Sequence, residues 1–344
     1  MSGLSKKNIN ILITSVGRRS YLVKYFKEAL NGEGKVFVSN SSKLSAALKE
    51  ADDYVITPLI YDKQYIDFLV KYCLKNKINV IISLFDVDLP ILARNRQIFE
   101  KNGIRLIVSS ERVIHVCNDK YETYKFLTEN GFNTPLTYVN VNDFKLSLER
   151  KEISFPVVIK PRWGMGSLGI NIAENMEEFH VFYNKTKKSI LNTYLKYESN
   201  IDLDSSVLIQ EMINGKEYGL DIINDLDGNY KNTIVKEKYA MRAGETDCAI
   251  TIENQDAKLL GKSISEKLKH IANLDVDIFI DEKKIFVLEM NARFGGGYPF
   301  SHMAGVNLPL AIIKWLRNEN ADNYLIEKYN VVSQKDISII NINK

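Results

Sequence analysis

The sequence has 344 residues, 45% of them hydrophobic and 26% charged, which is the composition of a globular protein with about two or three domains. The formal net charge is only +3 and the lysines are spread along the chain, which excludes a nucleic acid as an implied partner. The three cysteines are far apart, which favours a reducing compartment and argues against a structural zinc site. No apolar run reaches the length of a signal peptide core or a membrane span, so we expect a cytoplasmic protein with no membrane partner.

Short apolar strands alternate with amphipathic helices in the first third of the chain. Strands are expected at residues 9–14, 35–39, 54–57, 80–83 and 104–108, and helices at residues 21–30, 64–75 and 89–102. This alternation predicts a doubly wound parallel sheet with ligands at the carboxyl ends of its strands. Gly17, Arg18 and Arg19 follow the first strand, and Asp86 and Asp88 follow the fourth. Two arginines at a helix start are most simply explained by solvation, but they also suit an acidic substrate group.

A buried lysine and a glycine-rich loop mark the centre of the chain. Residues 155–161 form an apolar strand that carries Lys160, and Gly164, Gly166 and Gly169 follow within a few residues. A lysine on the buried face of a strand needs an anion or a carboxylate partner, and the N–H groups of a glycine-rich loop can surround phosphate oxygens. The pair predicts a phosphate site; the alternative is a lysine that caps an edge strand before a turn.

A third apolar strand is expected at residues 207–213. Asn214–Gly215 predicts a hairpin-like break, after which the chain continues as a strand at 217–223. Such a break exposes backbone donors and acceptors around residues 211–213, which suits the edge of an adenine. Glu217 would then emerge where its carboxylate could accept hydrogen bonds from the hydroxyl groups of a ribose.

The loop at residues 240–247 combines several polar side chains. Arg242, Glu245 and Thr246 make a compact set there. An exposed hairpin loop explains this set about as well as a binding site does, so the sequence leaves both interpretations open.

The strand at 284–291 ends in an alternation of polar residues. Glu289, Asn291 and Arg293 occupy every second position, which places them on one face of a strand. Asp277, on the neighbouring antiparallel strand, can lie beside Glu289, and two adjacent carboxylates repel each other unless a cation lies between them. Carboxylate and amide oxygens suit Mg²⁺, and a guanidinium suits phosphate. The alternative is a half-buried strand end with a solvated polar edge.

In this order, the motifs resemble those of the ATP-grasp superfamily, particularly its carbamoyl-phosphate-synthase-like stand-alone carboxylate–amine ligases. The resemblance covers nearly the whole chain and implies an α/β pre-ATP-grasp domain with a doubly wound parallel sheet at residues 1–112. A two-lobed α+β ATP-grasp fold would follow, with its first lobe at 113–190 and its second at 191–344. ATP and Mg²⁺, with Mn²⁺ as an alternative ion, are the implied cofactors.

The resemblance also assigns roles to individual residues. The nucleotide would be bound by Lys120, Lys160, Gly164, Gly166, Ser167, Glu211, Met212, Ile213 and Glu217, and the metal ions by Asp277, Glu289 and Asn291; we expect the catalytic residues to be Arg293, Arg242 and Lys160. Two positions depart from the family pattern. Ala292 stands where many relatives have proline, and Asp277 replaces the glutamine of carbamoyl phosphate synthetase.

The implied reaction joins a small-molecule carboxylate to an amine. ATP would convert the carboxylate to an acylphosphate, which the amine would capture to form an amide or peptide bond, with ADP and phosphate as products. The alternatives are a carboxylase of the biotin or bicarbonate type, a carbamoyl-phosphate-like enzyme, and a nucleotide-binding protein without turnover. The length of the chain argues against carbamoyl phosphate synthesis itself. We expect either a monomer or a homodimer.

Overall fold

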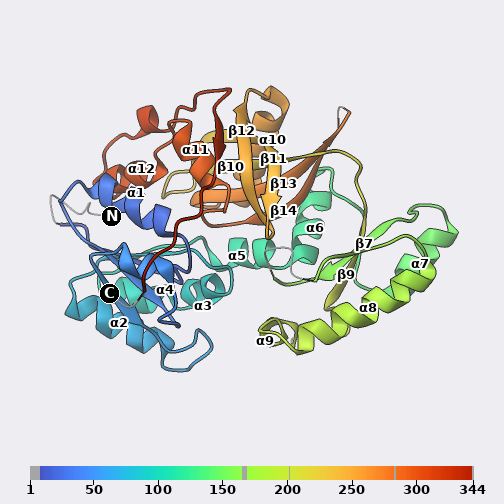
Figure 1. The fold of residues 1–344 in the computed structure, drawn as a ribbon, viewed down its shortest axis with the longest axis horizontal. Helices are drawn as coiled ribbons and strands as arrows, with labels where there is room; N and C mark the ends of the chain where they lie inside the picture. Colours follow the sequence, from blue (N-terminus) through green and yellow to red (C-terminus); the bar gives the residue numbers. More distant parts are fainter. Residues whose placement is uncertain (1–7, 165–168, 201, 283, 343–344) are drawn as a thin grey trace.

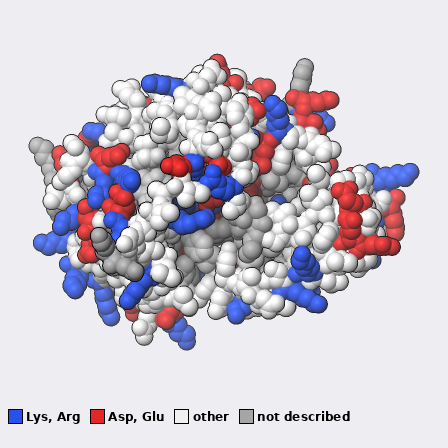
Figure 2. Space-filling model, viewed as in Figure 1, with Lys and Arg blue, Asp and Glu red and all other residues white. Residues whose placement is uncertain are grey.

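A computed structural model of the protein describes residues 8–164, 169–200, 202–282 and 284–342. The strands of these residues form three sheets, and helices pack against each of them (Figure 1). On the face shown in Figure 2, acidic and basic side chains are interspersed, in keeping with the small net charge. No helix in the described part of the chain combines the length and the apolar character that crossing a membrane requires.

The N-terminal sheet is parallel throughout, which confirms the predicted doubly wound architecture. Its strands, in spatial order, are β3 (Asp53–Ile56), β2 (Val36–Asn40), β1 (Ile11–Thr14), β4 (Val80–Ser83) and β5 (Arg105–Ile107). Its helices are α1 (Ser20–Leu30), the 3₁₀ turn η1 (Ala46–Lys49), α2 (Tyr65–Lys75), α3 (Asp88–Arg94) and α4 (Arg96–Lys101). The single helix expected at 89–102 is therefore two helices. The break falls at Asn95, whose side-chain amide donates to the main-chain oxygen of Ile91 at 2.8 Å and so competes with the helix for that carbonyl.

The second sheet is antiparallel and lies at one end of the molecule (Figure 1). Its strands are β6 (Thr137–Tyr138), β9 (Val207–Glu211), β7 (Val157–Pro161) and β8 (Asn171–Ala173), and its helices are α7 (Val141–Glu149), α8 (Met176–Leu191) and the short α9 (Lys196–Ser199). Helices α5 (Glu111–Asn118) and α6 (Lys120–Glu129) lead into it from the N-terminal sheet. The boundary expected at residue 190 separates β9 from the other strands of its own sheet.

The third sheet is antiparallel and contains the expected polar strand. Its order is β14 (Lys284–Asn291), β13 (Ala272–Asp281), β10 (Lys216–Asn224), β11 (Tyr230–Arg242), β12 (Glu245–Ile252) and β15 (Val332–Gln334). Helices α10 (Gln255–Leu268), α11 (Tyr298–Met303) and α12 (Leu308–Leu316) and the 3₁₀ turn η2 (Asp322–Tyr324) complete this part of the chain.

The hairpin expected at residues 207–223 is wrong. Strands β9 and β10 belong to different sheets, and the segment 212–215 crosses from one sheet to the other. Gly215 makes this crossing possible because a Cβ at this position would lie 2.7 Å from the main-chain oxygen of Ile280 on β13. The close approach to β13, rather than a turn back onto β9, decides the path of the chain.

The clusters of buried hydrophobic residues show which parts of the fold pack together. Phe26 of α1 and Ile312 of α12 belong to one buried cluster, so the N-terminal sheet and the C-terminal helices share a core. The second sheet has a separate core, which contains Phe144, Phe179 and Ile209. The second sheet can therefore move against the rest of the molecule without opening the shared core.

Candidate active site

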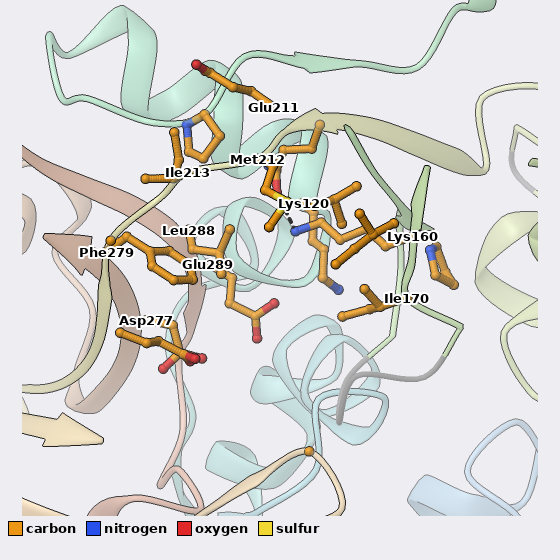
Figure 3. A pocket seen from close by; sticks show the side chains of 18 of the residues that line it. Lys120, Lys160, Ile170, Glu211, Met212, Ile213, Asp277, Phe279, Leu288 and Glu289 are labelled. Atoms are coloured by element: carbon orange, nitrogen blue, oxygen red, sulfur yellow. Dashed lines mark hydrogen bonds between the residues drawn. The ribbon is translucent and has the colours of Figure 1, made fainter. Parts of the chain in front are cut away.

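A cavity of about 620 Å³ lies between the second and third sheets and collects many of the predicted residues (Figure 3). The predicted residues that line it are Lys120, Lys160, Gly164, Glu211, Met212, Ile213, Glu217, Asp277 and Glu289. Asn291 and Arg293 line an adjoining cavity of about 110 Å³. Arg242 lines neither cavity, and Gly166 and Ser167 lie outside the described residues. Residues from the first and the last of the motifs that resemble the ATP-grasp superfamily thus line the same cavity.

Lys160 lies buried on β7, and no carboxylate of the described residues is in direct contact with its charge. Its Nζ donates to Oε1 of Gln210 at 2.7 Å, and the amide nitrogen of Gln210 donates to Oγ1 of Thr137 at 2.8 Å. Burial lowers the pKa of Lys160 to about 8, although the charge of Glu289 opposes the shift. A buried ammonium that is oriented but not neutralised is suited to binding an anion.

Lys120 occupies the first position of α6, where a network of polar contacts holds it. Asp119 caps this helix by accepting from the main-chain nitrogen of Tyr121 at 3.0 Å, and it also forms a two-pronged ion pair with Arg162 at 2.7 and 2.8 Å. The Nζ of Lys120 donates to the main-chain oxygen of Gly164. The helix start and the beginning of the glycine-rich loop are therefore held together, which brings Lys120 beside Lys160 (Figure 3).

The chain that crosses between the sheets forms one wall of the cavity. Glu211 uses both its carboxylate and its main-chain N–H to hold Leu136, at 3.0 and 2.8 Å. Met212 and Ile213 follow and line the cavity. The main chain is therefore held in place at Glu211, directly before the two residues that line the cavity.

Lys238 of β11 joins two predicted ligand-binding residues, and the sequence reasoning missed it. Its Nζ donates to a carboxylate oxygen of Glu217 and to one of Asp277, each at 2.6 Å. These carboxylates raise the pKa of Lys238 despite its burial. A signal was available, because Lys236 and Lys238 are two residues apart and so face the same side of a strand. Lys236 pairs with Asp221 in the same layer.

The predicted carboxylate pair is confirmed by the strand register. Asp277 on β13 lies directly opposite Glu289 on β14, and the amide nitrogen of Asn291 donates to Glu289 at 3.3 Å. Burial raises the pKa of Asp277 to about 7, and the neighbouring carboxylates of Asp275 and Glu289 add to the shift. Burial also acts on Glu289, but nearby lysines bring its pKa below the ordinary value. Asp277 is costly to ionise, and it lies beside a second carboxylate and an amide oxygen. This set of oxygen ligands fits a divalent cation.

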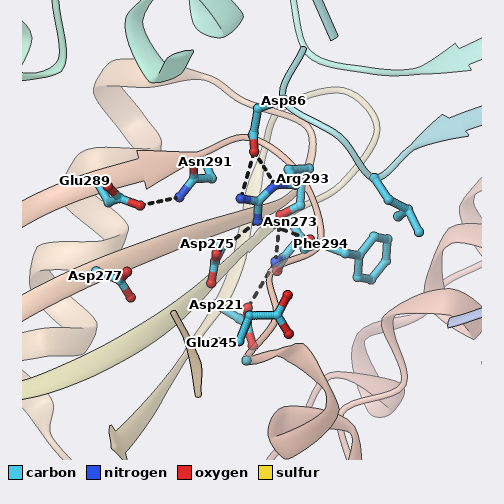
Figure 4. A network of polar contacts seen from close by, with 12 residues as sticks. Asp86, Asp221, Glu245, Asn273, Asp275, Asp277, Glu289, Asn291, Arg293 and Phe294 are labelled. Carbon is cyan, nitrogen blue, oxygen red and sulfur yellow. Dashed lines mark hydrogen bonds and ion pairs between the residues drawn. The ribbon is translucent and has the colours of Figure 1, made fainter. Parts of the chain in front are cut away.

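Arg293 is held by two carboxylates from different parts of the chain (Figure 4). Its guanidinium contacts Asp86 at 2.9 and 3.0 Å and Asp275 at 3.1 Å. Asp86 follows β4 of the N-terminal sheet, so this network fixes the end of the polar strand against that sheet. Both ion pairs join Arg293 to carboxylates of the protein itself, so contact between Arg293 and a phosphoryl group stays a prediction.

Two other candidates from the sequence form contacts with side chains of the protein itself. Asp88 is buried at the start of α3 and accepts hydrogen bonds from Tyr65 and Ser83, each at 2.9 Å, so it supports the sheet interior. Arg242 lies half exposed on the β11–β12 hairpin and pairs with Asp247 at 2.8 Å. In the same hairpin, it is Glu245 and Thr246 that line the smaller cavity.

Two family matches cover most of the chain. Residues 11–107 match the family described as PylC-like, N-terminal domain, and residues 117–297 match the family described as ATP-grasp domain.

Curated relatives share about a quarter of their residues with the chain over the matched regions. The carbamoyl phosphate synthase large chain of Pseudothermotoga lettingae is 24% identical over 285 residues, which are 80% of this chain and 24% of the relative. The arginine-specific large chain of Bacillus subtilis is 24% identical over 270 residues, which are 75% of this chain and 25% of the relative. The chain thus spans about a quarter of the length of these relatives.

Solved structures share the fold at low sequence identity. The biotin carboxylase domain of the Hydrogenobacter thermophilus 2-oxoglutarate carboxylase, solved with MgADP, ADP and bicarbonate, has a TM-score of 0.70 and 18% identity over 94% of this chain and 73% of that chain. The L-amino acid ligase of Bacillus licheniformis has a TM-score of 0.65 and 19% identity over 91% of this chain and 75% of that chain. Because the ATP-grasp match alone covers more than half of its length, the chain belongs to the ATP-grasp family, with a PylC-like N-terminal domain.

Proposed function

We propose that the protein is an ATP-dependent ligase that joins a carboxylate to an amine. The substrate carboxylate attacks the γ-phosphorus of ATP, the bond to the β-phosphate oxygen breaks, and ADP leaves. The amine nitrogen then attacks the acylphosphate carbon, loses a proton and expels phosphate, which leaves an amide. The observation that carries the proposal is the cavity in which Lys120 and Lys160 face Asp277 and Glu289 (Figure 3).

The contacts of the cavity residues support one orientation of the nucleotide. Lys120 and Lys160 would bind its phosphates, and Glu217, held by Lys238, would bind the ribose. The main-chain N–H of Glu211 already donates to Leu136, so the main chain of Met212 and Ile213 would meet the adenine. The predicted phosphate contacts of Gly166 and Ser167 fall outside the described residues.

Mg²⁺, or Mn²⁺ in its place, would be held by Asp277, Glu289 and Asn291, and it would supply charge neutralisation for the triphosphate. Lys238 keeps the Asp277 carboxylate oriented, and Asn291 does the same for Glu289. Among the described residues that line the larger cavity there is no cysteine or histidine. Phosphoryl transfer by positioned charges needs no protein nucleophile, in agreement with this lining.

The test is trapping of the acylphosphate. The protein is incubated with ATP, Mg²⁺ and a panel of carboxylic acids in the presence of hydroxylamine, and both ADP and acyl hydroxamate are measured. We expect an acid-dependent hydroxamate in stoichiometric amount with ADP. Glu289→Gln should reduce it at least 100-fold, whereas Glu253→Gln, at an exposed position, should leave it unchanged.

Two outcomes would favour other functions. ADP formation that depends on bicarbonate and needs no amine would favour a carboxylase. Binding of MgATP without any acid-dependent ADP formation would favour a nucleotide-binding protein without turnover.

A further inference from the structure

The smaller cavity lies next to the proposed nucleotide site. Met241, Gly244, Asp277 and Glu289 line both cavities, and Asn291 lines the smaller one alone. A molecule in the smaller cavity would therefore lie against the strand proposed to hold the metal ion. Its volume of about 110 Å³ is below the roughly 150 Å³ known to hold benzene, so it fits a carboxyl group with one or two further carbons.

Most of the cations around this cavity already have carboxylate partners. Lys236 pairs with Asp221, Lys238 with Glu217 and Asp277, and Arg293 with Asp86 and Asp275. Arg19 differs from them. Its Nη1 donates to the main-chain oxygens of Leu84 and Phe294, at 2.6 and 3.1 Å, and within the described chain it forms no ion pair. The two carbonyls fix the guanidinium at the cavity wall without neutralising its charge.

The hydroxyl group of Tyr21 does not compensate the charge of Arg19. Its oxygen is buried and has no hydrogen-bond partner among the described residues. The charged groups that act on it include Arg19, Glu245 and Arg293, which line the smaller cavity, whereas Tyr21 is not among the lining residues. Burial raises the pKa of Tyr21 to about 12, so the hydroxyl remains a donor at neutral pH. As a donor it cannot neutralise Arg19, whose guanidinium carries parallel N–H groups that match the two oxygens of a carboxylate.

An acidic residue, Glu245, also lines the smaller cavity. Glu245 packs over the glycine turn, where a Cβ on Gly296 would lie 3.3 Å from its carboxyl carbon, and it pairs with Lys335 at 3.3 Å. Burial acts against ionisation of Glu245, but Lys335 and Arg19 bring its pKa below the ordinary value, so it is charged. This carboxylate can accept from an amino or hydroxyl group next to the substrate carboxylate.

From these contacts we infer that the smaller cavity binds the carboxylate substrate of the proposed ligase, a short carboxylic acid whose anion is held by Arg19. The inference rests on the proposed function, because it assigns one of the two substrates of that reaction to a place. The carboxylate is common to short amino acids, hydroxy acids and unsubstituted acids. Glu245 would discriminate between them through its contact with the amino or hydroxyl group.

The test measures binding and turnover separately. Glycine, L-alanine, lactate and propionate are titrated into the protein saturated with MgADP, and binding is followed by calorimetry. The same acids are then assayed by hydroxamate formation with ATP and hydroxylamine. We expect Arg19→Gln to weaken binding of the acid and to raise its KM at least tenfold, with the KM for ATP within twofold of the native value.

Arg18→Gln is the matched control, because Arg18 is exposed and adjacent but lines neither cavity. It should change acid binding less than twofold, and Arg19→Lys, which keeps the charge, should retain more affinity than Arg19→Gln. Binding of an acid that depends on Arg19 supports the inference even where no hydroxamate forms, and the missing hydroxamate would then count against the proposed function alone. Failure of all four acids to bind the native protein, or equal effects of Arg18→Gln and Arg19→Gln, would overturn the inference.

Discussion

At the scale of single residues, the site depends on buried charges whose protein partners are incomplete. Lys160 contacts the neutral amide of Gln210, and Asp277 has one lysine partner but two carboxylate neighbours. The charged form of each group costs more free energy in its buried position than a charge costs at an ordinary surface position. A nucleotide with a bound cation would supply the missing charge on both sides.

The depressed pKa of Lys160 predicts the pH dependence of nucleotide binding. The free protein has a pKa of about 8 at this residue, and phosphate oxygens would raise it on binding. Binding therefore takes up a proton above pH 8, so affinity is full below pH 8 and falls as the pH rises through that value, by up to about tenfold per unit. Calorimetric titration of MgADP between pH 6.5 and 9.5 measures the slope. A flat profile in the native protein, or the same slope in Lys160→Arg, would contradict the assignment.

The bridge made by Lys238 predicts a joint loss of binding and stability. Lys238→Met leaves Glu217 and Asp277 without their cation, so we expect weaker MgADP binding, at least tenfold, and a loss of about 2–4 kcal/mol in the free energy of unfolding. Urea denaturation and nucleotide titration measure the two effects. Lys216→Met is the control, because Lys216 forms an exposed pair with Glu237 and should affect neither quantity. Equal behaviour of the two variants would remove Lys238 from the site.

The sequence alone was enough to identify residues whose charged or polar side chains differ from those of their neighbours in the chain. Lys160 stands out in an apolar strand, and the alternation of Glu289, Asn291 and Arg293 stands out at a strand end. Gln210 and Lys238 were missed because an amide or a lysine in a strand is ordinary until its partner across the sheet is known. Their roles depend on contacts between strands that are distant in sequence.

At the scale of elements, local sequence determined some pairings but not others. Strands β13 and β14 are close in sequence, so their pairing could be predicted, but the turn alone would place Asp277 opposite Leu288. A register shift between Asp277 and Ile278 brings Asp277 opposite Glu289. The dipeptide Asn214–Gly215 gave the same local signal for a turn, yet the chain there crosses between two sheets. The crossing depends on contact with β13, which lies more than fifty residues later in the sequence.

The close contact at Gly215 predicts a cost for any side chain there. Gly215→Ala would place a Cβ 2.7 Å from the main-chain oxygen of Ile280, so we expect a loss of about 1–3 kcal/mol in the free energy of unfolding. The crossing segment would also shift, and MgADP should bind more weakly. Asn214→Ala, at the preceding position, tests for a loss of turn preference alone and should cost less. A Gly215→Ala variant as stable as the native protein would show that the crossing takes another path.

At the scale of the whole molecule, two units meet around the larger cavity. The N-terminal sheet and the C-terminal helices share a core, and the pair between Arg293 and Asp86 also joins the N-terminal sheet to the third sheet. The second sheet, with its own core, contacts the N-terminal part through stacking of Tyr197 on Tyr61, with ring centroids 4.3 Å apart. This arrangement would let the second sheet close over the proposed nucleotide while the smaller cavity stays fixed.

The stacked tyrosines predict how closure can be loosened. Tyr197→Ala removes the ring contact, so we expect MgADP to bind about three- to tenfold more weakly and amides of α8 to exchange hydrogen faster. Hydrogen exchange measured by mass spectrometry, with and without MgADP, follows both effects. Tyr54→Ala, at an exposed tyrosine of β3, is the control. Unchanged exchange in Tyr197→Ala would mean that the contact does not restrain the second sheet.

The position of the nucleotide tests the account most directly. We predict that a crystal structure of the protein with MgADP will show the phosphates within hydrogen-bond distance of Lys120 and Lys160, and the metal ion on Asp277, Glu289 and Asn291. A nucleotide bound outside the cavity between the second and third sheets, or a metal ion held by other residues, would contradict the account.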